Sequence, residues 1–137
     1  MIRRQSHTTI FVLDQNEAMR FYCDVLEFEV RANFEMGHGL RWVTVSPKGQ
    51  PDLELILAPI VPGPMFTDAT VVQMKDLVEQ GAFGIGVFET DDCKAEYERL
   101  LELDVTFTQP PQEQFYGLEA LAKDNSGNWF SLVERKM

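Results

Sequence analysis

The stretch that decides the fold is residues 124–134, which read Asp-Asn-Ser-Gly-Asn-Trp-Phe-Ser-Leu-Val-Glu. Its first five residues are Asp, Asn, Ser, Gly and Asn, which favour the backbone angles of a tight reversal. The apolar run that follows, residues 129–133, is typical of a strand. Side chains alternate between the two faces of a strand, so the run divides into two sets, Phe130 and Leu132 on one face and Trp129, Ser131 and Val133 on the other.

The rest of the chain repeats one order of elements, a strand, a helix and three strands. The first copy comprises a strand at residues 7–13, a helix that begins after Asp14, and strands at 28–34, 40–46 and 53–58. Glu17 lies three residues after Asp14, which is the spacing of a capping box. The second copy comprises a strand at 83–89, a helix at 91–103, strands at 105–109 and 118–123, and the closing strand. Neither copy can cover its own sheet, so the pattern predicts that the two copies pair.

A Pro/Gly-rich segment at residues 59–64 separates the two copies. Residues 67–80 then carry spaced apolar positions and end at Gly81, which suits a short helix. We therefore expect one domain over residues 1–137, with a first module at 1–60, a linker with a short helix at 61–80, and a second module at 81–137.

The closing stretch and the opening stretch Ser-His-Thr-Thr-Ile-Phe-Val-Leu-Asp (residues 6–14) together resemble the vicinal oxygen chelate superfamily. This superfamily includes glyoxalases, bleomycin-resistance and fosfomycin-resistance proteins and extradiol dioxygenases. The resemblance extends to residues 18–22 and 26–30. It implies an α+β fold in which two paired βαβββ modules form a cup-shaped curved sheet, with the helices on the convex side, and it implies a homodimer.

Strand alternation predicts which side chains line this cup. In the first strand Thr8, Ile10 and Val12 are the more apolar set and should face the helix. In the fourth strand the corresponding set is Leu53, Leu55 and Leu57. The side chains left for the concave face are His7, Thr9, Phe11, Glu54, Ile56 and Ala58.

In metal-dependent members of the superfamily, the first and last strands of each module supply the ligands. By this resemblance, His7 and Glu54 occupy two ligand positions, and Ile85 and Ser131 occupy the other two. Isoleucine has no donor atom, and the serine hydroxyl is a poor one. We therefore expect no cofactor. The alternative is one divalent ion (Zn, Ni, Mn or Fe) held by His7 and Glu54, acting as a Lewis acid. Without an ion, His7 is expected to pair with Glu54.

Further pocket candidates come from two other places. Arg41 and Trp42 are adjacent in the third strand, so one of them must face the cup. An arginine there could fix an anion, and the alternative is a salt bridge at the rim. Residues 110–117 resemble a loop, Pro-x-x-x-x-x-Tyr-Gly, that overhangs the pocket in this superfamily, which makes Phe115 or Tyr116 a candidate lid. The full set of expected pocket residues is His7, Thr9, Phe11, Arg41, Trp42, Glu54, Ile56, Ile85, Tyr116, Trp129 and Ser131.

Composition limits the partners. The chain has 12 basic and 22 acidic residues and a formal net charge of −10, which disfavours nucleic acid and anionic membrane surfaces as partners. No run has the roughly 20 apolar residues of a membrane span, and no apolar signal segment follows the N-terminus. Cys23 and Cys93 lie far apart in sequence and lack metal-site spacing, so we expect free thiols and a cytoplasmic protein.

Two functions follow from these observations. The first is a metal-free protein that binds a small molecule in a largely apolar cup, as bleomycin-resistance proteins do. The second is a metal-dependent lyase, isomerase or dioxygenase that uses His7 and Glu54. The missing ligands at Ile85 and Ser131 favour the first.

Overall fold

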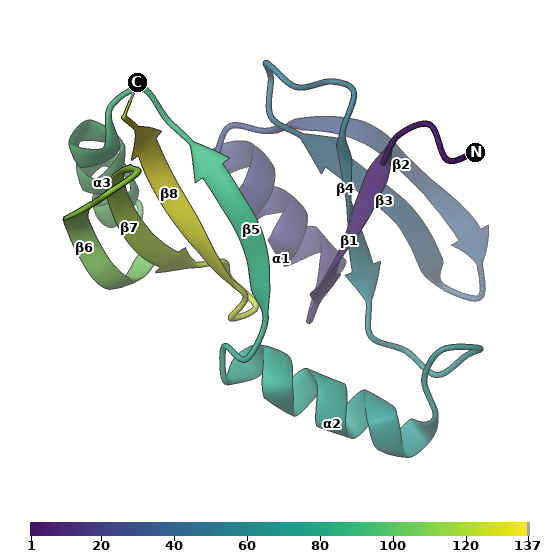
Figure 1. The fold of residues 1–137 in the computed structure, drawn as a ribbon. Helices are drawn as coiled ribbons and strands as arrows, with labels where there is room; N and C mark the ends of the chain where they lie inside the picture. Colours follow the sequence, from purple (N-terminus) through teal and green to yellow (C-terminus); the bar gives the residue numbers. More distant parts are fainter. Residues whose placement is uncertain (137) are drawn as a thin grey trace. The chain divides into compact units, whose positions relative to one another are not determined.

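A four-stranded sheet with a helix packed on one face occurs twice in this computed structural model, which describes residues 1–136 (Figure 1). The first compact unit is residues 1–75, and the second begins at Asp76. The first unit contains β1 (His7–Val12), α1 (Gln15–Arg20), the π-helical turn η1 (Phe21–Val25), β2 (Glu29–Gly37), β3 (Leu40–Ser46) and β4 (Glu54–Pro59). The helix α2 (Asp68–Glu79) is followed by β5 (Gly84–Glu89), α3 (Cys93–Glu102), β6 (Thr106–Gln114), β7 (Gly117–Lys123) and β8 (Trp129–Arg135). The α+β fold with two βαβββ modules is thus confirmed.

The first sheet has the strand order β1-β4-β3-β2, and β1 pairs with β4 in parallel. The Asp14 side chain accepts a hydrogen bond from the Glu17 backbone nitrogen, so the predicted cap starts α1. Gln15 fixes α1 to the sheet because its side-chain amide donates to the carbonyl oxygens of Arg41 and Leu57, at 2.9 Å each. The core beneath α1 consists of buried apolar side chains: Ile10, Val12, Ala18, Tyr22, Val43, Val45, Leu55 and Leu57.

The second sheet has the corresponding order β5-β8-β7-β6, with β5 and β8 parallel. Asp92 caps α3 by accepting from the Ala95 backbone nitrogen. The helix packs on β6, β7 and β8. The buried side chains on this face include Cys93, Leu100, Ala120, Ala122, Phe130 and Leu132.

The predicted closing turn and strand are present. Oδ1 of Asp124 accepts hydrogen bonds from the backbone nitrogens of Ser126, Gly127 and Asn128, at 2.9–3.0 Å. The second carboxylate oxygen accepts from the Asn128 side-chain amide at 3.1 Å. All of these groups lie within four residues of one another, so the turn is stabilised by its own sequence.

Among the strands, β6 extends furthest beyond its sequence-based range. β6 continues to Gln114 and includes Pro110 and Pro111, although residues 105–109 alone were predicted. Proline is tolerated there because β6 is an edge strand and its register shifts between Gln109 and Gln112. The division of the chain into two units falls within α2, between Lys75 and Asp76, so the Pro/Gly-rich segment belongs to the first unit. No helix within residues 1–136 is long and apolar enough to cross a membrane.

Candidate functional site

The first sheet has one face covered by α1 and a second face, here called the open face, that carries most of the predicted pocket residues of the first module. Along β1 and β4 this face consists of three directly paired positions: His7 with Glu54, Thr9 with Ile56, and Phe11 with Ala58. Their neighbours on the other face, Ile10, Val12, Leu55 and Leu57, are buried against α1. The structure therefore brings these six candidate side chains together on one surface.

A polar cluster occupies one end of the open face. His7 Nε2 lies 3.3 Å from Glu54 Oε2, and both side chains are half-buried. The hydroxyl of Thr44, which is fully buried, donates to Glu54 Oε1 over 2.6 Å. On the other side of the imidazole ring, His7 Nδ1 lies 2.8 Å from Ser6 Oγ. The Glu54 carboxylate is therefore held in a fixed orientation by two neighbours.

Arg41 and Trp42 separate onto the two faces of β3. The rings of Trp42 and His7 have centroids 6.2 Å apart, which places Trp42 on the open face. The Arg41 guanidinium instead donates to Asn16 of α1 and, at 2.7 Å, to Asn33 Oδ1. Arg41 thus links the sheet to α1, which covers the opposite face, and lies apart from the other pocket candidates of the first unit.

An apolar pocket of about 220 Å³ occupies the other end of the open face. The strands contribute Phe11 and Ala58, and the β2–β3 hairpin contributes Met36 and Leu40. The remaining wall is the last residue of β4, Pro59, and the segment after it: Val61, Pro62, Gly63, Pro64, Met65 and Phe66. Every side chain in this lining is apolar.

The segment after β4 was predicted only as a break between modules, so most of this pocket was missed. Phe66 of this segment packs edge-to-face against Phe11, with ring centroids 5.3 Å apart and ring planes at 77°. A backbone hydrogen bond of 3.0 Å from Gly63 to the Phe66 carbonyl closes the loop. The signal available in the sequence was Val61, Met65 and Phe66, apolar residues that a solvated linker has no need of.

In the second unit the predicted residues lie around β8 and β5. Ser131 pairs with Leu121 of β7 and with Val87 of β5. An extra residue in β5 lies between its pairs Gly84–Trp129 and Val87–Ser131, where Gly86 has φ +123°. Val87, not Ile85, is therefore the neighbour of Ser131, and the equivalence of Ile85 with His7 is broken by this bulge. Neither Val87 nor Ile85 has a side-chain atom that can bind a metal ion.

Tyr116 lies in the turn between β6 and β7, beside the exposed Phe115. The Tyr116 hydroxyl donates to Glu119 Oε1. This hydrogen bond raises the pKa of Tyr116, because the neighbouring carboxylate favours the protonated phenol. The hydrogen bond to Glu119 holds the Tyr116 ring against β7, within the β6–β7 hairpin.

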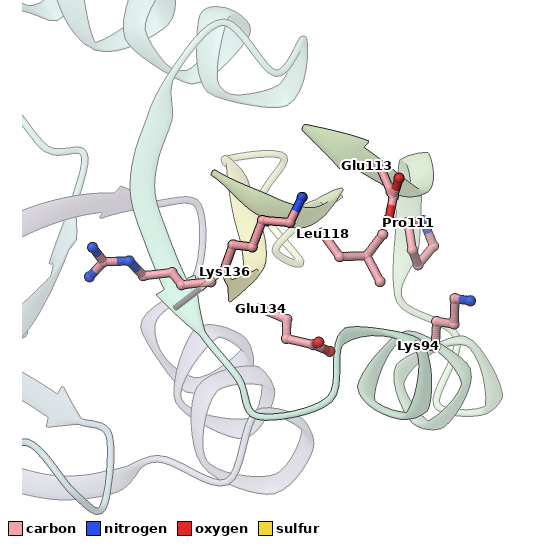
Figure 2. A pocket seen from close by; sticks show the side chains of 8 residues that line it. Lys94, Pro111, Glu113, Leu118, Glu134 and Lys136 are labelled. Carbon is pink, nitrogen blue, oxygen red and sulfur yellow. The ribbon is translucent and has the colours of Figure 1, made fainter. Parts of the chain in front are cut away.

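A second pocket, of about 370 Å³, lies in the second unit beside α3 (Figure 2). Its lining combines both signs of charge: Lys94, Pro111, Glu113, Gly117, Leu118, Glu134, Arg135 and Lys136. Glu134 projects toward the start of α3, where its carboxylate accepts from the Cys93 backbone nitrogen at 2.9 Å. None of the predicted pocket residues lines it, so we assign the candidate site to the open face of the first sheet.

The donor atoms in the described part of the chain do not fit a tightly held metal ion. Structural and catalytic zinc sites use three or four protein ligands. Within residues 1–136, no three His, Cys, Asp or Glu side chains are arranged so that they could hold an ion. His7 and Glu54 are a pair of suitable type, and the neighbours that complete their contacts are the hydroxyls of Ser6 and Thr44.

Comparison with known proteins gives a consistent family. A family model described as the glyoxalase/bleomycin resistance protein/dioxygenase superfamily matches residues 4–132. The crystal structure of UcmS2 is similar, with 44% identity, a TM-score of 0.91 and coverage of 98% of this chain and 99% of that one. TnmS3, an antibiotic binding protein from Streptomyces sp. CB03234, is 27% identical, with a TM-score of 0.76 and 98% of each chain covered. The protein YurT of Bacillus subtilis (strain 168) is 34% identical over 129 residues, which are 93% of this chain and 96% of YurT.

Proposed function

The chain belongs to the glyoxalase/bleomycin resistance protein/dioxygenase superfamily, and on this premise we propose that it binds a small, largely apolar organic molecule without a catalytic metal. The observation that carries the proposal is the apolar pocket at the end of β1 and β4, which has no polar side chain in its lining. The description of TnmS3 as an antibiotic binding protein supports an antibiotic-like molecule as the ligand class.

The size of the pocket limits what it can enclose. Drug-sized ligands occupy sites of roughly 300–1,000 Å³, and a cavity of about 150 Å³ can hold benzene. A pocket of about 220 Å³ therefore encloses a ring-sized part of a molecule, while the remainder extends along the open face. Met36 and Met65 in its wall have flexible, polarisable side chains that can adjust to different ring shapes.

A metal-dependent lyase, isomerase or dioxygenase is the second candidate function. The observation that favours it is the distance of 3.3 Å between His7 Nε2 and Glu54 Oε2, since imidazole and carboxylate are common ligands of divalent ions. Against it, no three His, Cys, Asp or Glu side chains within residues 1–136 are arranged so that they could hold an ion. We therefore rank it below metal-free binding.

We also propose that the protein is a cytoplasmic homodimer. Val72 and Leu77 of α2 are large apolar side chains that remain exposed in the single chain, at 69% and 41%, and a second copy could cover them. Cys23 and Cys93 are free thiols, as expected in a reducing compartment. Light scattering at micromolar concentration tests the dimer, and a mass of 15.7 kDa would contradict it.

Titration with N-phenylnaphthylamine, an uncharged dye that fluoresces in apolar surroundings, tests the binding proposal. We expect a saturable increase in fluorescence with one dye per chain. Phe66→Ala should weaken binding by about 10-fold, because the dye loses an aromatic wall worth roughly 1.4 kcal/mol. The control is Leu103→Ala, which removes an exposed apolar side chain that is not part of the pocket lining and should leave the affinity unchanged. Unsaturable binding, or equal affinities for wild type and Phe66→Ala, would overturn the proposal.

A further inference from the structure

The apolar pocket and the polar cluster lie on the same pair of strands at a distance that the register fixes. The pair Phe11–Ala58 belongs to the pocket lining, and His7–Glu54 lies four residues earlier along β1 and β4. Parallel strands rise about 3.3 Å per residue, so the two pairs are about 13 Å apart. Thr9 and Ile56 form the surface between them. One elongated molecule could therefore contact both ends.

Among the basic side chains within residues 1–136, only His7 contacts the Glu54 carboxylate at the polar end. Glu54 contacts Thr44 and His7, and within residues 1–136 no lysine or arginine side chain pairs with it. The nearby Arg31 is already engaged, because it donates to Ser46 Oγ at 2.6 Å and pairs with Glu29 at 3.4 Å. A half-buried carboxylate interacts more strongly with a cation than a fully solvated one does.

The indole of Trp42 lies at the same end of the face. Its ring centroid is 6.2 Å from that of His7, and His7 in turn contacts the Glu54 carboxylate. An indole face attracts a cation through the ring quadrupole, by about 0.5–2 kcal/mol according to exposure. A carboxylate beside an aromatic ring is a combination that recognises a protonated amine. The chain's net charge of −10 also attracts cationic molecules over longer distances.

We propose that the molecule bound on the open face is an amphipathic amine, whose apolar group enters the pocket and whose ammonium lies between Glu54 and Trp42, about 13 Å away. This inference rests on the proposed binding function and adds the charge and the length of the ligand. Glu54 is then the residue that selects cations, and the apolar pocket contributes affinity regardless of charge.

Three dansyl probes of similar length test the inference: dansyl cadaverine, which ends in an ammonium, and its analogues that end in a neutral hydroxyl or a carboxylate. We expect the ammonium probe to bind about 10-fold more tightly than the neutral probe at low ionic strength, and the carboxylate probe to bind most weakly. Glu54→Gln should abolish the preference for the ammonium and leave the affinity for the neutral probe unchanged. Added salt should reduce the preference.

Glu35→Gln is the matched control, because it removes one negative charge from the edge strand β2, at a position paired with Arg41. It should preserve the preference for the ammonium probe. Equal affinities of the wild type for all three probes, or a preference that survives Glu54→Gln, would overturn the inference while the binding function stands. If the neutral probe also fails to bind, both the inference and the proposed function are contradicted.

Discussion

His7 and Glu54 stand directly opposite each other in the parallel pair of β1 and β4, with 3.3 Å between Nε2 and Oε2. The Glu54 carboxylate also accepts from the buried hydroxyl of Thr44. The Glu54 carboxylate thus connects the half-buried His7 ring to the fully buried Thr44 hydroxyl. The stability of the protein should therefore depend on which side chain replaces Glu54.

Glu54→Ala should destabilise the protein by about 1–3 kcal/mol, because it leaves the Thr44 hydroxyl buried without this acceptor. Glu54→Gln keeps a carbonyl oxygen at that position and should cost clearly less. Urea unfolding of the two variants measures the difference. Equal losses of stability would show that the Thr44 contact does not depend on an acceptor at residue 54.

Asp124→Ala should lower the free energy of unfolding by about 2–4 kcal/mol, since three backbone nitrogens and one side-chain amide lose a buried charged acceptor. Asp52, an exposed aspartate, provides the control variant Asp52→Ala, which should lie within about 0.5 kcal/mol of the wild type. Chemical denaturation compares them. Similar stabilities of the two variants would refute the role assigned to the turn.

Cys93 should resist modification in the folded protein. Its thiol is buried under β8, and burial, followed by the nearby Glu134 carboxylate, raises its pKa above the ordinary value of 9.0. In a Cys23→Ser background, reaction with a disulfide reagent at about pH 8 should be slow until the protein is unfolded. Rapid stoichiometric reaction in the native state would contradict this burial.

The same raised pKa predicts an alkaline loss of stability. Folding favours the neutral thiol, so the contribution of Cys93 is fully present below the unfolded-state pKa and disappears as the pH rises through the folded-state pKa. Above about pH 9, the wild type should therefore lose stability more steeply than Cys93→Ala. Thermal unfolding across that pH range measures how steeply the stability of each protein falls with pH. Equal slopes for the wild type and Cys93→Ala would show that Cys93 does not cause the alkaline loss of stability.

The parts of the fold that local sequence determines were predictable. The cap at Asp14 and the turn at Asp124 each depend on contacts within four residues. The alternation of β1 and β4 was also legible, because the helix-facing positions are more apolar than the positions on the open face. These local rules were enough to identify the module order and to place His7 beside Glu54.

The parts that depend on distant contacts were not predictable. Alternation required one of Arg41 and Trp42 to face the cup, but only the contact of Arg41 with Asn16 of α1 decides which. The bulge at Ile85 and Gly86 changes the partner of Ser131, and no residue count along β5 reveals it. The apolar pocket forms because a Pro/Gly-rich segment folds back onto Phe11, which composition alone describes as a linker.

The most direct test of metal-free binding is the dissociation constant of N-phenylnaphthylamine, measured for the wild type before and after exhaustive dialysis against a chelator. The account predicts the same dissociation constant in both samples, because the dye is held by the apolar pocket at Phe11 and Phe66. The contradicting result is a loss of binding on chelation that Zn, Ni, Mn or Fe(II) restores and that His7→Ala and Glu54→Ala each abolish.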